Sequence, residues 1–143
     1  MRTMLDEGHT WFLDSLKYED GLTIWLVEGL RSDGPEDLMV GGSVIKNTYA
    51  VEPTDSSKRA VVRFGVPVVW QVVDESYTSW DDTEERDDKS FLQVLTRSKY
   101  LDYVNENHGW YKDVAGPASH YRLWTAGEVI DVVAPETPVV SKS

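Results

Sequence analysis

The sequence predicts a mainly β fold of the α+β class, with an antiparallel sheet curled as a barrel or a sandwich and one inserted helix. Three observations predict it. Two pairs of apolar runs are each joined by a turn signal, residues 66–73 are rich in β-branched side chains, and one later segment has the period of a helix. Consecutive hairpins favour antiparallel neighbours, and a lone helix in such a chain covers an open end or face of the sheet.

The first hairpin is predicted between Trp11 and Leu30, where Asp20-Gly21 separates two apolar runs. Glycine supplies the positive φ that a tight turn needs. In the second run, the even-numbered residues 22–28 share one face of the strand and the odd-numbered residues share the other. Both faces are largely apolar, so this strand is predicted to be central or sandwiched.

Turn-forming residues at 32–37 interrupt the pattern. Residues 38–51 resume it, with a bulge or bend expected at Gly41-Gly42. Two further strands are predicted at 59–64 and 66–74, and the second of these has the strongest strand character in the chain.

The helix is predicted near Ser90 to Asn105. Its apolar stripe would consist of Phe91, Val94, Leu95, Leu101 and Val104. Ser90 is expected to cap the first turn, and Gly109 is a plausible stop.

A second hairpin is predicted from runs at 121–125 and 129–134 with a turn between them. Without internal repeats or a linker, residues 1–134 are predicted to form a single β-rich domain. Residues 135–143 contain two prolines and are predicted to be a loose C-terminal tail.

The composition limits the classes of partner. The net charge of −11 repels nucleic acid and anionic membrane surfaces, since binding to phosphates depends on Lys and Arg. No apolar run approaches the roughly 20 residues of a membrane span, and the N-terminus lacks the apolar run of a signal peptide. The chain has no cysteine, which excludes disulfides and thiolate zinc sites and fits a reducing compartment. A cytoplasmic protein is therefore expected, with no nucleic-acid or membrane partner.

Residues 74–88, the acidic segment, hold eight carboxylates and one Arg around Tyr77 and Trp80. Such a segment can be a solvated loop, a cation site or a landing surface for a basic protein. An EF-hand spacing is absent. For a landing surface, the two aromatics would anchor the partner and the carboxylates would steer it. The candidate partner-binding residues are Asp74, Glu75, Tyr77, Trp80, Asp81, Asp82, Glu84 and Glu85.

Enzymatic signals are weak. The sequence shows no nucleophile elbow, no recognisable Ser-His-Asp order, no Walker loop and no dinucleotide fingerprint, so no catalytic residue, metal or cofactor is assigned. His108 is expected at a helix end and His120 at a strand edge. Trp25, Trp70 and Trp124 lie within strand runs and are expected in the core. The alternative function is a small-molecule binding module or hydrolase, with a pocket lined by Trp and Tyr and one carboxylate or His.

Four segments, at 90–92, 98–104, 120–124 and 129–133, resemble small acidic bacterial proteins of unassigned function, some of which are immunity proteins against secreted toxins. The resemblance covers roughly the C-terminal third and carries no functional residue across. It adds to the expectation of a non-enzymatic interaction protein that binds a basic protein partner, with toxin immunity as the concrete version. The oligomeric state stays open.

Overall fold

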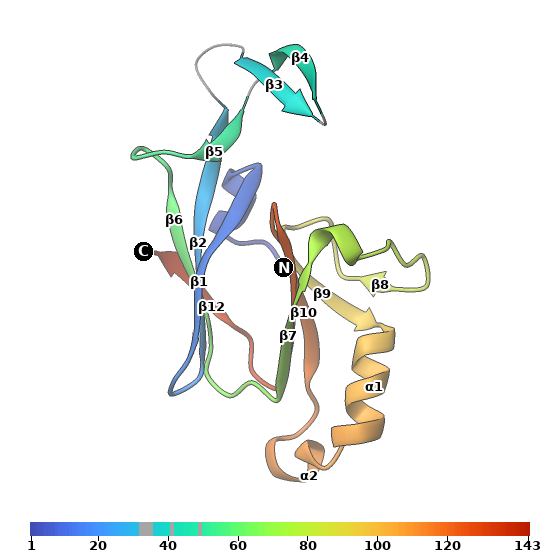
Figure 1. The fold of residues 1–143 in the computed structure, drawn as a ribbon. Coiled ribbons are helices and arrows are strands. Elements are labelled where there is room, and N and C mark those ends of the chain that lie inside the picture. Colours follow the sequence, from blue (N-terminus) through green and yellow to red (C-terminus); the bar gives the residue numbers. More distant parts are fainter. Residues whose placement is uncertain (32–35, 41, 49) are drawn as a thin grey trace.

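The computed structural model of the chain describes residues 1–31, 36–40, 42–48 and 50–143, and for 36–40 and 43–48 it describes the backbone alone (Figure 1). Its elements in chain order are η1 (Met4–Glu7), β1 (Thr10–Tyr18), β2 (Leu22–Arg31), β3 (Glu36–Val40), β4 (Ser43–Thr48), β5 (Val51–Pro53), β6 (Arg59–Phe64), β7 (Val69–Asp74), η2 (Glu75–Tyr77), β8 (Glu85–Arg86), β9 (Leu92–Arg97), α1 (Lys99–His108), α2 (Tyr111–Ala115), β10 (Ser119–Trp124), β11 (Glu128–Ala134) and β12 (Val139–Lys142).

Within this described part of the chain, two antiparallel sheets form a sandwich and do not close into a barrel (Figure 1). The first sheet has the order β1-β2-β6-β12, and β5 pairs with the far end of β2. The second sheet has the order β7-β11-β10-β9-β8, while β3 and β4 form a separate hairpin. The predicted fold class is thus confirmed, with the sandwich as its form.

The hydrophobic core lies between the two sheets. Leu22, Ile24 and Leu26 of β2 face it from the first sheet, because alternate residues of a strand point to the same side. Ile130 and Val132 of β11 face it from the second sheet. The other buried members of this cluster are Leu5, Trp11, Ala60, Val62, Phe64, Leu92, Tyr121, Leu123 and Ala134.

The tryptophans of the core differ from the prediction. Trp11 of β1 is fully buried, whereas Trp25, Trp70 and Trp124 are only half-buried. Trp70 packs against the margin of the core cluster and against the ring of Tyr18 at the sheet edge. A strand run marks a residue as part of a sheet, but the facing layer decides which side is deeply buried.

The first hairpin is confirmed, and its turn explains its sequence. Asp20 and Gly21 have φ of 51° and 107°, the positive values that tight two-residue turns need. A Cβ on Gly21 would also lie 2.6 Å from the carbonyl oxygen of Phe64. Glycine is therefore required here for both conformation and space. The second predicted hairpin is confirmed as β10 and β11.

The turn predicted at 32–37 and the bend at Gly41-Gly42 fall partly outside the described residues, since 32–35 and Gly41 are not described. Gly42 has φ of 82° and lies in the turn between β3 and β4.

The predicted helix at 90–105 was wrong in its first half. Leu92–Arg97 is strand β9, and α1 begins only after Ser98, whose Oγ accepts the N–H of Leu101. The apolar residues of β9 suit either period, because Leu92 and Val94 face the core between the sheets and Leu95 faces the helix side. Pairing with β10 decides for a strand. Gly109 ends the helix, as expected.

The predicted loose tail was wrong for Val139–Lys142. These residues form β12, which pairs with the free edge of β6 and places Val140 opposite Val62. Val140 also packs against the core. Pro135 and Pro138 precede the strand and so remove no hydrogen bond from it.

A third layer covers the outer face of the second sheet. In Figure 1, α1 lies on the side of this sheet that faces away from the first sheet. Val104 of α1 is buried there together with Leu95, Val129 and Val133. The acidic segment also crosses this face, since Trp80 lies against Trp124 of β10.

Candidate functional site

The second sheet holds both ends of the acidic segment. At its start, Asp74 closes β7 and accepts the backbone N–H of Ser76 at 2.8 Å, which begins the short η2 turn. At the other end, Glu85 and Arg86 form β8 and pair with β9. The loop between these points is therefore short and fixed at two places on one sheet.

Trp80 lies on this loop with 63 % of its surface exposed, and Tyr77 is 84 % exposed. Three contacts hold the indole of Trp80. The guanidinium carbon of Arg86 lies 4.2 Å from the ring centroid, the ring of Trp124 lies 6.4 Å away, and Nε1 donates to Asp82 Oδ1 at 2.8 Å. The ring is thus both accessible and oriented.

Five of the six predicted steering carboxylates are accessible. Asp74, Glu75, Asp82 and Glu85 are exposed, and Asp81 is half-buried. Hydrogen bonds from the hydroxyl and backbone N–H of Thr83, aided by Lys99, hold the pKa of Asp81 below its usual value. Asp81 Oδ2 also lies 3.5 Å from Lys99 Nζ, which ties the loop to the start of α1.

Glu84 is the exception. Its side chain is only 6 % exposed, and its Oε1 accepts from Arg86 Nη2 at 2.7 Å and from Arg122 Nη1 at 2.8 Å. This carboxylate points into the molecule, between two guanidinium groups. Glu84 therefore belongs to the interior and offers a partner little surface.

Glu84 is the outer end of a continuous row of polar groups, the buried polar chain, made of Glu84, Arg122, Asp131, His120 and Ser98. Arg122 Nε donates to Asp131 Oδ1 at 2.8 Å, and His120 Nε2 lies 2.6 Å from the same oxygen. On the far side of the imidazole, Nδ1 lies 2.7 Å from Ser98 Oγ. The buried polar chain runs from the acidic segment through β10 and β11 to the first turn of α1.

Burial alone would raise the pKa of Asp131, but the hydrogen bonds and charges of His120 and Arg122 outweigh it and hold this pKa below its usual value. For Arg122, burial lowers the pKa, and Glu84 and Asp131 more than reverse that effect. Ion pairs in such surroundings persist because each member is hydrogen-bonded as well as paired. Nearby, burial and the charge of Asp131 raise the pKa of Tyr100 to about 12.

Sequence reasoning placed His120 at a strand edge, and this was wrong. His120 lies on β10, the central strand of its sheet, with no exposed surface. The predicted second hairpin already contained a signal for the buried polar chain. Its turn places Arg122 directly opposite Asp131, and opposite charges at facing positions inside an apolar hairpin indicate a buried pair.

Ser98, His120 and Asp131 are the residue types of a hydrolytic triad, but their arrangement does not suit nucleophilic catalysis. In that triad the serine bonds Nε2 and the carboxylate bonds Nδ1, whereas here the two nitrogens are exchanged. All three residues are buried, and Ser98 Oγ already accepts the N–H of Leu101 at 3.0 Å. The trio joins the first turn of α1 to β10 and β11 in the interior.

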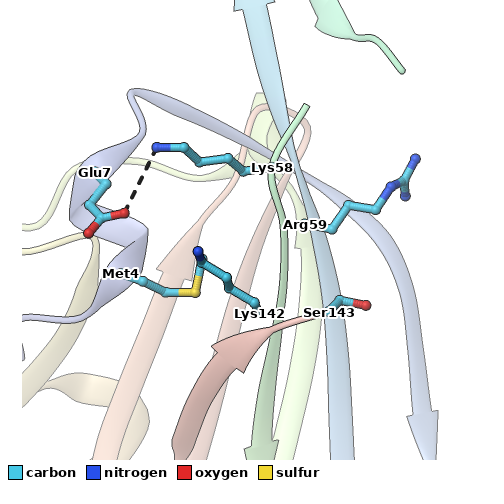
Figure 2. A pocket seen from close by; sticks show the side chains of 6 residues that line it. All are labelled: Met4, Glu7, Lys58, Arg59, Lys142 and Ser143. Carbon is cyan, nitrogen blue, oxygen red and sulfur yellow. Dashed lines mark ion pairs between the residues drawn. The ribbon is translucent and has the colours of Figure 1, made fainter. Parts of the chain in front are cut away.

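A pocket of about 190 Å³ opens elsewhere, and its lining residues are Met4, Glu7, Lys58, Arg59, Lys142 and Ser143 (Figure 2). Figure 2 shows Lys58 and Glu7 pointing toward each other, with Nζ and Oε2 3.9 Å apart. Arg59 turns away from them and lies 3.9 Å from Asp14. Of the three cationic side chains that line the pocket, Lys58 and Arg59 thus have carboxylate partners. The lining contains no Trp or Tyr, the residues expected around a ligand in the alternative function.

Among the described residues, no group of three or more His, Asp or Glu side chains gathers in a way that could hold a metal ion. No helix in that part of the chain is long and apolar enough to cross a membrane. No protein-family model, curated protein or solved structure matches the chain.

Proposed function

We propose that this protein is a non-enzymatic interaction protein that binds a basic protein partner through the Trp80 face. This face consists of Asp74, Glu75, Tyr77, Trp80, Asp81, Asp82 and Glu85. The observation that carries the proposal is the state of Trp80, whose ring is 63 % exposed and yet held by Arg86, Asp82 and Trp124.

An oriented, exposed indole suits binding for an energetic reason. Ordering a flexible side chain at an interface opposes association by about 0.5–1.5 kcal/mol. Trp80 is ordered before any partner arrives, so most of the apolar area that it buries on binding favours the complex. Tryptophan and tyrosine are also the residues most often found at the energetic centres of protein interfaces.

The surrounding charge selects the kind of partner. Five carboxylates flank the two aromatics in a chain with a net charge of −11. Their field attracts a basic surface and speeds its encounter, while it repels phosphate backbones. A basic protein is therefore a better match to this face than a nucleic acid.

Toxin immunity in the cytoplasm is the concrete version of the proposal. It is supported by the resemblance of the segments at 90–92, 98–104, 120–124 and 129–133 to small acidic bacterial proteins that include immunity proteins. In this version the Trp80 face would cover the basic surface of the toxin.

The test compares Trp80→Ala with Trp110→Ala in pull-downs at about 50 to 500 mM salt, followed by measurement of Kd for each retained protein. Trp110 is the matched control, because it is 79 % exposed but lies between the two helices. We expect a basic protein whose Kd rises at least about tenfold in Trp80→Ala and is unchanged in Trp110→Ala. Salt should weaken binding by screening the carboxylates.

Equal affinity of the two variants, or retention of acidic proteins only, would contradict the proposal. A small molecule that co-purifies with the chain and raises its Tm would instead favour the ligand-binding alternative.

A further inference from the structure

The buried polar chain ends directly behind the indole of Trp80. Arg86 connects the two, because its guanidinium lies against the ring and its Nη2 donates to Glu84 Oε1 at 2.7 Å. On another side, Arg86 Nε donates to Gln93 Oε1 of β9 at 3.0 Å. The guanidinium is thus fixed on two sides, and only 15 % of the Arg86 side chain is exposed.

We propose that Glu84 and Arg122 are positioning residues for Trp80, and that they set the orientation of the exposed ring from inside the molecule. The inference rests on the proposed function only in taking Trp80 as a partner contact. It assigns Glu84 a different role from Glu85, which is exposed and would act on a partner through its charge.

The shared oxygen of Glu84 gives this residue its effect. One atom, Oε1, accepts from both Arg86 and Arg122, so the position of one guanidinium depends on the other. Arg122 is in turn fixed by Asp131, at 2.8 Å. Such hydrogen bonds are stronger in the low dielectric of the interior, and a single neutral substitution disturbs the whole row.

The buried polar chain also explains how the acidic segment is fixed to α1. Inside the molecule, Asp131 and His120 lead to Ser98, the residue that caps the helix. At the surface, Asp81 and Lys99 form a second and weaker link at 3.5 Å. The acidic segment and the first turn of α1 are thus connected by the buried polar chain and by the exposed Asp81–Lys99 ion pair.

The test compares two identical chemical changes at adjacent positions, Glu84→Gln and Glu85→Gln. Each removes one negative charge, but only Glu84 contacts the two arginines, since Glu85 is exposed. The readout is the ¹H–¹⁵N resonance of the Trp80 indole in the protein without a partner, assigned by its loss in Trp80→Phe.

We expect Glu84→Gln to move this resonance toward that of free tryptophan and to broaden it, and Glu85→Gln to leave it in place. An unchanged Trp80 resonance in Glu84→Gln would overturn the proposal, as would equal shifts in the two variants.

The indole of Trp11 reports whether the variants fold, because it is buried and donates to the carbonyl of Leu5 at 2.9 Å. If Glu84→Gln also loses the Trp11 resonance, that variant has not folded, and Arg86→Met is then used in its place. That variant keeps the apolar stem and removes the guanidinium fork at the surface end of the path. The Trp80 resonance must then shift while that of Trp11 stays; a Trp80 signal that stays fixed overturns the proposal.

Affinity separates this inference from the proposed function. For the basic partner at 150 mM salt, we expect Kd to rise at least about tenfold in Glu84→Gln and less than about threefold in Glu85→Gln. A shifted indole together with binding that ignores Trp80 would sink the proposed function and leave the positioning role intact. If the Trp80 indole resonance does not shift but binding depends on Trp80, the positioning role is wrong and the proposed function stands.

Discussion

Trp11 and Trp80 carry the same side chain into opposite surroundings. The Trp11 indole is fully buried between the sheets, its N–H bonded to Leu5 and its backbone carbonyl bonded to the N–H of Ala126 at 2.9 Å. Trp80 rests on the outer face of the second sheet with one side open. Their substitutions should therefore separate stability from recognition.

Trp11→Ala should lower the free energy of unfolding by about 3–5 kcal/mol, because it empties a large buried volume and removes the shorter of the two hydrogen bonds to the Leu5 carbonyl. Trp80→Ala should lower it by about 1 kcal/mol or less, chiefly through the lost contact with Arg86. Urea denaturation of both variants is the measurement. Similar losses in the two would show that Trp80 is a core residue.

Asp131 should give the stability a defined pH dependence. Its pKa in the folded protein lies below the value of about 3.9 for an unfolded Asp. Its ionised form therefore stabilises the fold fully above that value, and this stabilisation is lost as the pH falls through the folded pKa. Asp131→Asn should lower the free energy of unfolding by about 3 kcal/mol at pH 7, because it leaves Arg122 poorly compensated.

The difference in the free energy of unfolding between wild type and Asp131→Asn should narrow below about pH 4, as Asp131 becomes protonated in the wild type. Denaturant titrations at several pH values measure it, with the exposed Asp14→Asn as the control. A difference that widens below about pH 4 would contradict the conclusion that Asp131 is ionised in the folded protein.

The exposure of Trp80 and Tyr77 was predictable, because aromatics among so many carboxylates have no apolar run to join. The burial of Trp11 was not. Its neighbours Phe12 and Leu13 are also apolar, so the local pattern does not say which residue of the run faces the opposite sheet.

At the scale of elements, the start of α1 depends on one serine that does two things. Ser98 Oγ accepts the N–H of Leu101 and also bonds His120, so it joins a helix cap to the buried polar chain. Ser90, where the periodicity predicted the cap, instead precedes β9 and donates its backbone N–H to Asp88.

Ser98→Ala should lower the free energy of unfolding by about 2–3 kcal/mol, since it removes a cap and leaves His120 Nδ1 without its bond. Ser90→Ala should lower it by less, about 1 kcal/mol, since it removes only the side-chain hydrogen bond to Asp88. Thermal melts followed by circular dichroism compare the two. A larger loss of stability in Ser90→Ala than in Ser98→Ala would support a helix that starts at Ser90.

The elements that sequence predicted well are those formed by neighbours in the chain. Both hairpins have their turn signals between their strands, and both are confirmed, the first with a register shift between Leu13 and Ser15. β9 and β12 were missed because their partners lie elsewhere: β9 pairs with β10 across α1 and α2, and β12 pairs with β6. No local pattern contains that information.

At the scale of the whole molecule, residues 74–88 contain eight of the 25 Asp and Glu residues, and the second sheet holds this segment at β7 and β8. The buried polar chain connects this segment, through β10 and β11, to the residue that caps α1. A mainly β, antiparallel fold was predictable from the strand patterns, whereas the choice between barrel and sandwich depends on which edges pair at long range.

A combined Glu75→Gln, Asp82→Asn and Glu85→Gln variant should keep its fold, because all three side chains are exposed. Its Tm should stay equal or rise by a few degrees as like-charge repulsion falls, while its affinity for a basic partner decreases. Calorimetry at low and high salt measures the first effect. A large fall in Tm would mean that these carboxylates bind a cation or each support a structural contact.

The pairing of β12 with β6 and of β11 with β7 also determines how the chain reaches its native state. Each pairing completes a sheet by joining strands that are distant in sequence. Such contacts require large loops to close first, which slows folding to the range of about milliseconds to seconds. The hairpins β1–β2 and β10–β11 should therefore form early, and the pairings of β12 with β6 and of β11 with β7 should form later. In pulse-labelled hydrogen exchange during refolding, amides of 119–134 should become protected before those of 139–142, and the opposite order would place the nucleus at the β6 edge.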